Sequence, residues 1–288
     1  MNSDERMIVI PRSLTSIESI ETLYHLVQTQ PAASAYAFDM THVPFIKPYG
    51  VVGLVAAARL LTARSGRPVQ VLSLDAQVHQ YLHRMDVFEG ANEWLSPPPF
   101  SGAEWSRTVT TANLLELHRI GGPSDIAPII TRAERIFTCW LDGPHLHGLL
   151  NVLSEVCANI YQHSGDSAGC VVIQKYEMGQ DTVICLAVGD LGWGIRNTLE
   201  KRYGILGTSA LPYLHDALHG RSSRATGRGG LGLRLVKQIA RDMNGMFWLR
   251  SEGAALLAQQ TLPVVERADL AHVPGTQIVV ELRAPLRS

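Results

Sequence analysis

A stripe of three polar side chains on one predicted helix constrains the fold of this chain more than any other feature. Glu155, Asn159 and His163 recur at intervals of four residues within residues 153–165, and most of the other residues of this stretch are apolar. At the helical period these side chains share one face. Burying them without hydrogen-bond partners would cost roughly 1–3 kcal/mol for each unsatisfied group. The stripe therefore faces either solvent, as in an ordinary amphipathic helix, or a polar ligand.

The composition is that of a globular protein and gives no sign of a nucleic-acid or membrane partner. The 288 residues are 46% hydrophobic and 18% charged, which allows two modest domains with real cores. The net charge of −1 supports no electrostatic argument for nucleic acid or an anionic membrane. The four cysteines form no CxxC pair, no signal peptide is evident, and no apolar run is long enough to span a bilayer. We expect a cytoplasmic protein with reduced thiols.

Hydrophobic periodicity divides the chain into two halves joined by a linker. Strands and helices alternate in residues 1–90, which predicts a small α/β domain. Residues 91–112 hold a proline triplet and two tryptophans with little periodicity, and we expect a linker there. Residues 113–288 form the predicted second domain. Strands are predicted at 7–10, 35–39, 69–73, 114–120, 169–174, 182–188, 246–250 and 277–282, and helices at 17–28, 50–64, 76–85, 126–140, 145–163 and 234–243.

Two glycine-rich motifs follow the striped helix, and each is ambiguous alone. Gly227, Gly229 and Gly232 satisfy the GxGxxG pattern of dinucleotide binding, but no buried strand precedes them, so a Rossmann site is not favoured. These glycines can still bring backbone amides close to phosphates at a helix N-terminus. Asp190 ends an apolar strand and is followed by Gly192. Its carboxylate is either ordinary turn chemistry or an acceptor for the exocyclic amine of a base.

In order and spacing these motifs resemble the GHKL superfamily, which includes gyrase-type, Hsp90-type, histidine-kinase and MutL-type ATP-binding domains. Residues 155–163 resemble its N box, 190–195 its DxGxGI box, 230–233 its GLGL box, and 275–276 its final Gly-Thr element. The resemblance implies an α/β fold of the α+β sandwich kind, in which helices pack on one face of a mixed sheet. It also implies ATP and Mg²⁺ as ligands.

The resemblance further implies a role for each matching residue. Glu155 would be the general base, Asn159 would ligate Mg²⁺, and Asp190 would accept a hydrogen bond from the adenine amino group. His163 would lie near the phosphates, residues 196–226 would form the nucleotide lid, and Thr276 would lie near the adenine. The complete predicted ATP site comprises Asn159, His163, Asp190, Gly192, Gly194, Ile195, Arg228, Gly229, Gly230, Leu231, Gly232, Leu233 and Thr276.

Within the superfamily, the chain resembles the anti-sigma-factor serine kinases most closely. No helical hairpin with a phosphoacceptor histidine is evident, as a histidine kinase would need. The first ninety residues resemble a STAS domain, the usual substrate of such kinases. Lys47, Pro48 and Tyr49 replace its Asp-Ser-Ser, which leaves Tyr49 as the one hydroxyl there. We interpret this half as a degenerate STAS-like docking module.

The predicted function is ATP- and Mg-dependent phosphoryl transfer to a Ser or Thr of a partner signalling protein that is STAS-like or sigma-factor-like. A non-catalytic ATP-dependent interaction switch is the first alternative. The others are a histidine-kinase-type catalytic domain lacking its phosphoacceptor helices and, more weakly, an ATPase clamp. The family resemblance also allows a homodimer.

Overall fold

The computed structural model describes residues 4–98, 113–205, 207–221, 232–260 and 262–285. The chain forms two compact units, residues 1–111 and 112–288.

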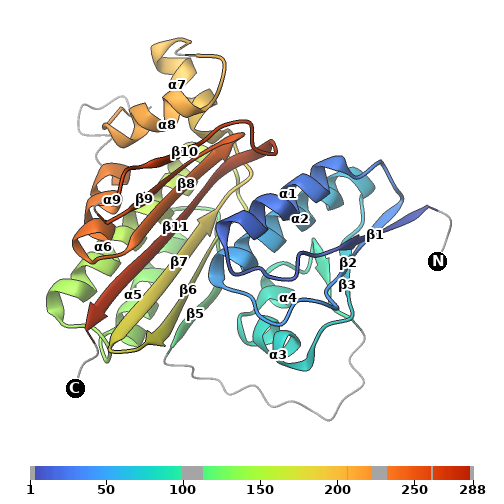
Figure 1. Cartoon of the computed structure of the whole chain (residues 1–288), viewed down its shortest axis with the longest axis horizontal. Helices are drawn as coiled ribbons and strands as arrows, with labels where there is room; N and C mark the ends of the chain where they lie inside the picture. Colours follow the sequence, from blue (N-terminus) through green and yellow to red (C-terminus); the bar gives the residue numbers. More distant parts are fainter. Residues whose placement is uncertain (1–3, 99–112, 206, 222–231, 261, 286–288) are drawn as a thin grey trace. The chain divides into compact units, whose positions relative to one another are not determined.

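The first unit is a four-stranded parallel sheet with helices in its crossover connections (Figure 1). The strands follow one another in chain order, as expected from alternating strand and helix patterns. Ile8, Tyr36, Phe38, Val69 and Val71 are buried on alternate positions of the strands. The elements are β1 (Glu5–Val9), α1 (Ile17–Thr29), β2 (Ala35–Asp39), α2 (Pro48–Ser65), β3 (Val69–Leu72), α3 (Ala76–Arg84), α4 (Val87–Gly90) and β4 (Leu95–Ser96).

Two features of this unit concern predictions made from the sequence: the expected linker and the Tyr49 hydroxyl. The segment expected to be a linker contributes β4, which pairs with β3 and completes the sheet; its two residues are too few to give a strand pattern. Tyr49 is buried on α2, and its hydroxyl donates to the backbone oxygen of Thr15. The Tyr49 hydroxyl, which the sequence analysis compared with a phosphoacceptor, is therefore occupied inside the fold.

The second unit is a seven-stranded sheet in the order β10-β9-β8-β11-β7-β6-β5. The sequence predicted a mixed sheet, but the strands pair antiparallel throughout. The strands β6 and β7 form the expected hairpin. The strands are β5 (Leu114–Ile120), β6 (Gly169–Met178), β7 (Asp181–Gly189), β8 (Met246–Glu252), β9 (Ala254–Gln259), β10 (Val265–Arg267) and β11 (Val273–Pro285).

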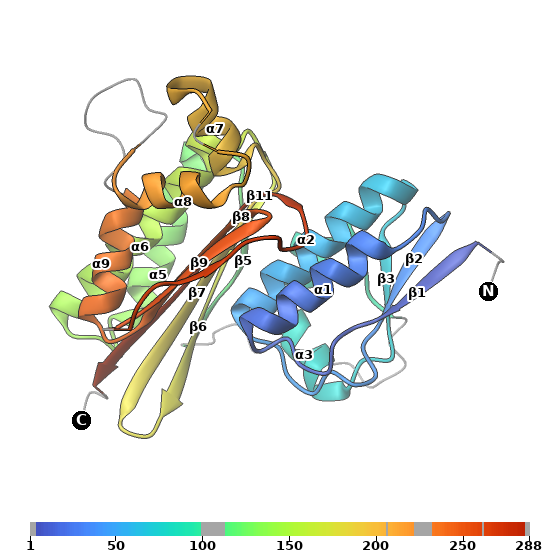
Figure 2. The same cartoon turned by 45° about the horizontal axis from the view of Figure 1, so that its top comes forward.

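Helices α5, α6 and α9 cover one face of this sheet (Figures 1 and 2). Their apolar sides and the facing strand residues form one core, which includes Leu153, Ile173, Leu186, Leu249 and Val280. The helices are α5 (Ile126–Phe137), α6 (Gly143–Asn159), α7 (Gly194–Tyr203), α8 (Leu211–Leu218) and α9 (Gly232–Asp242), with a short 3-10 turn, η1 (Pro123–Asp125), and a π-helix, η2 (Ile160–Ser164).

The structure refines the predicted elements at three places. The striped helix ends at Asn159 and continues as the π-helix η2, rather than as one α-helix to His163. The segment expected to be a polar lid, residues 196–226, holds most of α7 and all of α8. The strands β9 and β10 were not predicted. Among the described residues, no helix combines the length and apolarity that crossing a bilayer requires.

Leu153 tests the core beneath the striped helix, because its side chain is fully buried between α6 and the sheet. We expect Leu153→Ala to lower the free energy of unfolding by about 2–5 kcal/mol, through lost burial and the cavity left behind. Denaturant unfolding of the second unit measures the change. Met178→Ala is the control, because Met178 is exposed on β6 and its truncation should change the stability by less than about 0.5 kcal/mol. Equal effects of both variants would contradict this packing.

Candidate functional site

A pocket lies between α6, α9 and the ends of β7 and β11, with α7 and α8 along one side. Nine of the residues predicted from the sequence line it together, although they are spread over more than a hundred positions of the chain. These are Glu155, Asn159, His163, Asp190, Gly194, Ile195, Gly232, Leu233 and Thr276. The remaining lining is mostly apolar, with Val156, Ile160, Ser164, Val188, Thr198, Leu199, Ala217, Arg221, Leu235 and Ile278.

The polar stripe faces this pocket rather than open solvent. Glu155 and Asn159 lie one turn apart on α6, and His163 follows on η2. A π-helical turn holds more residues than an α-helical turn, so it rotates the chain less for each residue and keeps His163 on the pocket side. No hydrogen-bond partner among the described residues reaches the buried Nδ2 of Asn159. An amide that is buried on a pocket wall with unused hydrogen-bonding capacity favours a polar ligand there.

Asp190 follows β7 with its carboxylate held by backbone amides. Its Oδ1 accepts from Gly192 N at 2.9 Å and from Thr276 N at 3.3 Å. Its own backbone N donates to Thr276 O at 3.0 Å. The residue is 6% exposed, so these bonds orient a buried carboxylate toward the pocket. Such an oriented acceptor can recognise an exocyclic amine.

The end of the N-box region is bound directly to the Asp190 loop. Asp166 accepts from Leu191 N at 2.8 Å, and Trp193 N donates to Ser164 O at 2.7 Å. Gly192 makes this approach possible, because a β-carbon there would overlap the backbone oxygen of Ser164. The first glycine of the DxGxGI box therefore serves close packing between two loops.

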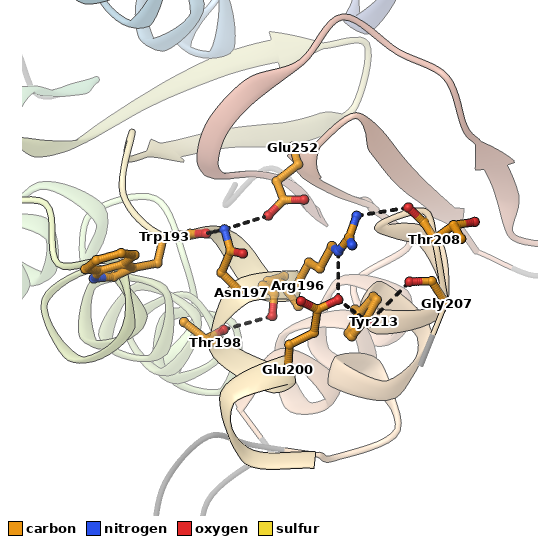
Figure 3. A network of polar contacts seen from close by, with 10 residues as sticks. Trp193, Arg196, Asn197, Thr198, Glu200, Gly207, Thr208, Tyr213 and Glu252 are labelled. Carbon is orange, nitrogen blue, oxygen red and sulfur yellow. Dashed lines mark hydrogen bonds and ion pairs between the residues drawn. The ribbon is translucent and has the colours of Figure 1, made fainter. Parts of the chain in front are cut away.

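The side of the pocket formed by α7 and α8 is held by a polar network, drawn in Figure 3. Arg196 donates to Glu200 Oε1 at 2.8 Å and to Thr208 O at 2.9 Å. The Tyr213 hydroxyl donates to the same Glu200 oxygen. These hydrogen bonds, first from Tyr213 and then from Arg196, hold the pKa of Glu200 below its usual range. The network joins α7, the segment after it and α8.

Glu252 supports the start of α7 from the end of β8. Its Oε1 accepts from Asn197 Nδ2 at 3.2 Å, and Asn197 also donates to Trp193 O at 2.7 Å (Figure 3). Burial raises the pKa of the Glu252 carboxyl, and the charges of His272 and Arg196 oppose that rise. Glu252 is thus a buried acid behind the pocket wall.

At the opposite end of the pocket, Glu155 lies against the start of α9. A β-carbon on Gly232 would collide with Glu155 Oε2, so the missing side chain leaves room for this carboxylate at a helix N-terminus. Helix N-termini favour anions, phosphates included. Four of the predicted ATP-binding residues, Arg228, Gly229, Gly230 and Leu231, lie outside the described residues.

The residues present are compatible with Mg²⁺ that is held mainly by a nucleotide. Among the described residues, no cluster of three His, Cys, Asp or Glu side chains could hold a metal by itself. Mg²⁺ commonly takes one or two protein oxygens together with phosphates and water. Asn159, on the pocket wall, is the candidate protein ligand through its amide oxygen. The unpartnered atom of this amide, Nδ2, is a hydrogen-bond donor and suits a phosphate oxygen.

Several residues of this site were not predicted from the sequence. Asp166 follows Ser164 and Gly165 in a turn, a position typical of carboxylates that cap backbone amides. Ser251 continues the inward-facing alternation of Phe247 and Leu249 along β8. Both signals are present in the sequence, but neither shows which backbone amide the side chain accepts from. Those partners, Leu191 N for Asp166 and Ile195 N for Ser251, are known only from the structure.

Residues 145–286 match the family model described as histidine kinase-, DNA gyrase B-, and HSP90-like ATPase. This match spans the N box, the Asp190 loop, the glycine box and the Gly-Thr element, which are the segments that meet at the pocket. No curated protein matches the chain in sequence.

Gly192→Ala tests the close approach of the two loops. We expect the added methyl group to force Ser164 away, lowering the free energy of unfolding by about 1–3 kcal/mol and weakening nucleotide binding. Thermal unfolding and calorimetric titration with ADP measure the two effects. In the control Gly143→Ala, at the start of α6, the methyl group meets no atom within 4 Å. A Gly192→Ala variant as stable as this control would contradict the proposed packing.

The raised pKa of Glu252 predicts a pH-dependent stability. The folded state holds the Glu252 proton above the ordinary pKa of 4.5, so this group's contribution to stability is fully present below that value and is lost as the pH rises through the folded-state pKa. Glu252→Gln removes this loss. The melting temperature of the variant minus that of the wild type should therefore be larger at about pH 8 than at about pH 4.

Glu134→Gln on the exposed side of α5 is the matched control for that measurement. The melting temperature of Glu134→Gln minus that of the wild type should change less with pH than the corresponding difference for Glu252→Gln. A difference for Glu252→Gln that is constant with pH would mean that the carboxyl is not perturbed by burial.

Proposed function

Because residues 145–286 belong to the family of histidine kinase-, DNA gyrase B- and HSP90-like ATPases, and so form an ATP-binding domain, we propose that the chain transfers phosphate from ATP to a Ser or Thr of a partner protein. The observation that carries this proposal is the position of Glu155. Its carboxylate lies at the N-terminus of α9, one helical turn from Asn159 on the same pocket wall. An acid that only supported the fold would not need to face a ligand pocket.

The two ends of the pocket have different chemistry, which orients the nucleotide. Asp190, held by backbone amides beside apolar Val188 and Ile278, suits an adenine ring and its amino group. Asn159, Glu155 and the start of α9 suit phosphates and their cation. We infer that the base lies toward Asp190 and the γ-phosphate toward Glu155.

The proposed step is an in-line displacement at the γ-phosphorus. The partner's hydroxyl oxygen forms a bond to phosphorus, the bond from phosphorus to the β–γ bridging oxygen breaks, and ADP leaves. Glu155 accepts the proton of the attacking hydroxyl. Mg²⁺ would be held by Asn159 together with the phosphates and, when bound, neutralises their charge. The protein's own contribution is positioning and proton acceptance.

The resemblance of the first unit to STAS domains supports a partner of the same signalling class. Tyr49 is buried and hydrogen-bonded, so that position is a poor internal acceptor of phosphate. We propose that the first unit docks a partner protein, STAS-like or sigma-factor-like, rather than serving as the substrate. This is the arrangement of an anti-sigma-type serine kinase with a separate substrate.

A second function is favoured by the network of Figure 3. Because Arg196, Glu200 and Tyr213 join α7 to α8 along the pocket, both helices can respond to a bound nucleotide as one piece. An ATP-dependent switch that selects partners without transferring phosphate would use the same pocket. A histidine-kinase-type catalytic domain would also use it, with a histidine on another chain as the acceptor.

Labelled ATP separates these functions. The purified chain is incubated with ATP carrying label on its γ-phosphate and with purified STAS-domain and sigma-factor proteins, in the wild type and in Glu155→Gln and Asn159→Ala. We expect transfer to a partner in the wild type. Loss of the general base should lower the rate about 10²–10⁴-fold in Glu155→Gln while ADP affinity is retained. Asn159→Ala should weaken nucleotide binding in the presence of Mg²⁺ and have little effect in EDTA.

The chemical stability of the product identifies the acceptor. Acid-stable, alkali-labile label on the partner supports a Ser or Thr acceptor, whereas acid-labile label indicates histidine and contradicts the serine kinase. Nucleotide binding without labelled protein or released phosphate favours the switch. Unchanged Mg-ATP affinity in Asn159→Ala would contradict the assignment of the metal ligand.

A further inference from the structure

Ser251 lies in a row of residues that crosses three neighbouring strands beneath the candidate base site. It is the last residue but one of β8 and lies directly opposite Thr276 of β11. The next residue of β11, Gln277, is opposite Gly189 of β7. Asp190 follows Gly189. Ser251 is 1% exposed and does not line the pocket. It can therefore influence a bound ligand only through the pocket residues that it contacts.

The hydroxyl of Ser251 uses its full hydrogen-bonding capacity. It donates to Gly275 O at 2.8 Å, accepts from Ile195 N at 3.0 Å, and accepts from the Thr276 hydroxyl at 3.4 Å. A serine hydroxyl offers one donor and two acceptor positions. Ser251 therefore joins the DxGxGI box to the Gly-Thr element through one buried atom.

One peptide group connects this hydroxyl to the carboxylate of Asp190. The carbonyl of Gly275 and the amide N–H of Thr276 belong to the same planar unit and point in opposite directions. Ser251 donates to the carbonyl end, and the amide end donates to Asp190 Oδ1 at 3.3 Å. A hydrogen bond at one end of a peptide group both orients the group and polarises the bond at its other end.

The second bond of Ser251 reaches Asp190 from the other side. By holding Ile195 N, Ser251 fixes the end of the loop in which Gly192 N donates to Asp190 Oδ1 at 2.9 Å. Both backbone amides that hold this oxygen are thus tied to Ser251. Gly275, at φ +82°, is the residue that lets the chain pass directly over Asp190, where a β-carbon would overlap the Asp190 backbone oxygen.

We propose that Ser251 is a positioning residue that sets the orientation of the Asp190 carboxylate and thereby the preference of the pocket for adenine over other purine bases. This inference rests on the proposed function, in which Asp190 accepts from the adenine amino group. It assigns selectivity to a buried hydroxyl that does not contact the nucleotide.

The test compares ADP with IDP, whose base carries a carbonyl in place of the amino group. A carboxylate aimed at that position attracts an amino group and repels a carbonyl oxygen, so the wild type should bind ADP more tightly. We define the selectivity ratio as the dissociation constant of IDP divided by that of ADP. In Ser251→Ala we expect this ratio to fall by about 2- to 10-fold, the equivalent of one net hydrogen bond. Inhibition of ADP binding by tripolyphosphate, which has no base, should be unchanged.

Two variants separate this role from general stability. Ser251→Thr retains the hydroxyl and should retain the wild-type ratio; Ser251→Cys retains the volume with only a weak donor and should behave as Ser251→Ala. Thr182→Val is the matched control, because the Thr182 hydroxyl is fully buried in β7 of the same sheet and has no partner among the described residues. It should leave the ratio unchanged. Melting temperatures confirm that each variant is folded.

The outcomes distinguish the two proposals. A wild type that binds neither ADP nor IDP would overturn the proposed function and this inference with it. A wild type that prefers ADP, with the same preference in folded Ser251→Ala and Ser251→Cys, would overturn only the role of Ser251. Weaker binding of ADP, IDP and tripolyphosphate alike would show that Ser251 supports the pocket without orienting Asp190, and would also overturn the inference.

Discussion

Close contact between backbones at the end of β7 is the constraint on which the rest of the site depends. Gly192 lies against the backbone oxygen of Ser164, and Gly275 lies against that of Asp190. Any side chain at either glycine would separate segments that hydrogen-bond to one another, because a β-carbon would occupy the space of a carbonyl oxygen. The carboxylate of Asp190 is oriented because three chain segments can approach it at backbone distance. The glycines of these motifs therefore act through packing as much as through any contact with phosphate.

The polar stripe of the N box is possible in an otherwise apolar helix because of where that helix lies. One side of α6 packs on the sheet through residues such as Leu153, and the stripe projects into the pocket instead. The change from α-helix to π-helix at Ile160 keeps His163 with Glu155 and Asn159, and π-helical turns are frequent at functional sites. The buried Nδ2 of Asn159, left without a partner among the described residues, is tolerable only if a ligand or solvent accepts its hydrogen bond.

The sequence predicted the segments that meet at the candidate site, because each motif is short and its key residues are glycines or isolated polar groups in apolar surroundings. Most strands and helices were also predicted within a few residues, since their periodicity is local. The strand β9 was missed because its sequence, Ala254–Gln259, lacks β-branched residues and alternation. Ser251 was missed for a different reason. Its importance comes from being opposite Thr276, and the register of β8 on β11 passes an irregularity between Val273 and Thr276 that no local pattern reveals.

Under the proposed function, the arrangement separates recognition of the base from the chemistry of transfer. Asp190 is held through β7, β8 and β11 of the sheet, whereas Glu155 belongs to α6 and meets the start of α9. Changes that disturb the orientation of Asp190 act on the base and need not displace Glu155, because different elements hold the two groups. Nucleotide selectivity and phosphoryl transfer are therefore expected to respond to different substitutions. A domain that had retained ATP binding only as a switch would need the contacts that orient Asp190 but could lose Glu155. The Glu155 carboxylate at the start of α9 is therefore the feature that argues for transfer.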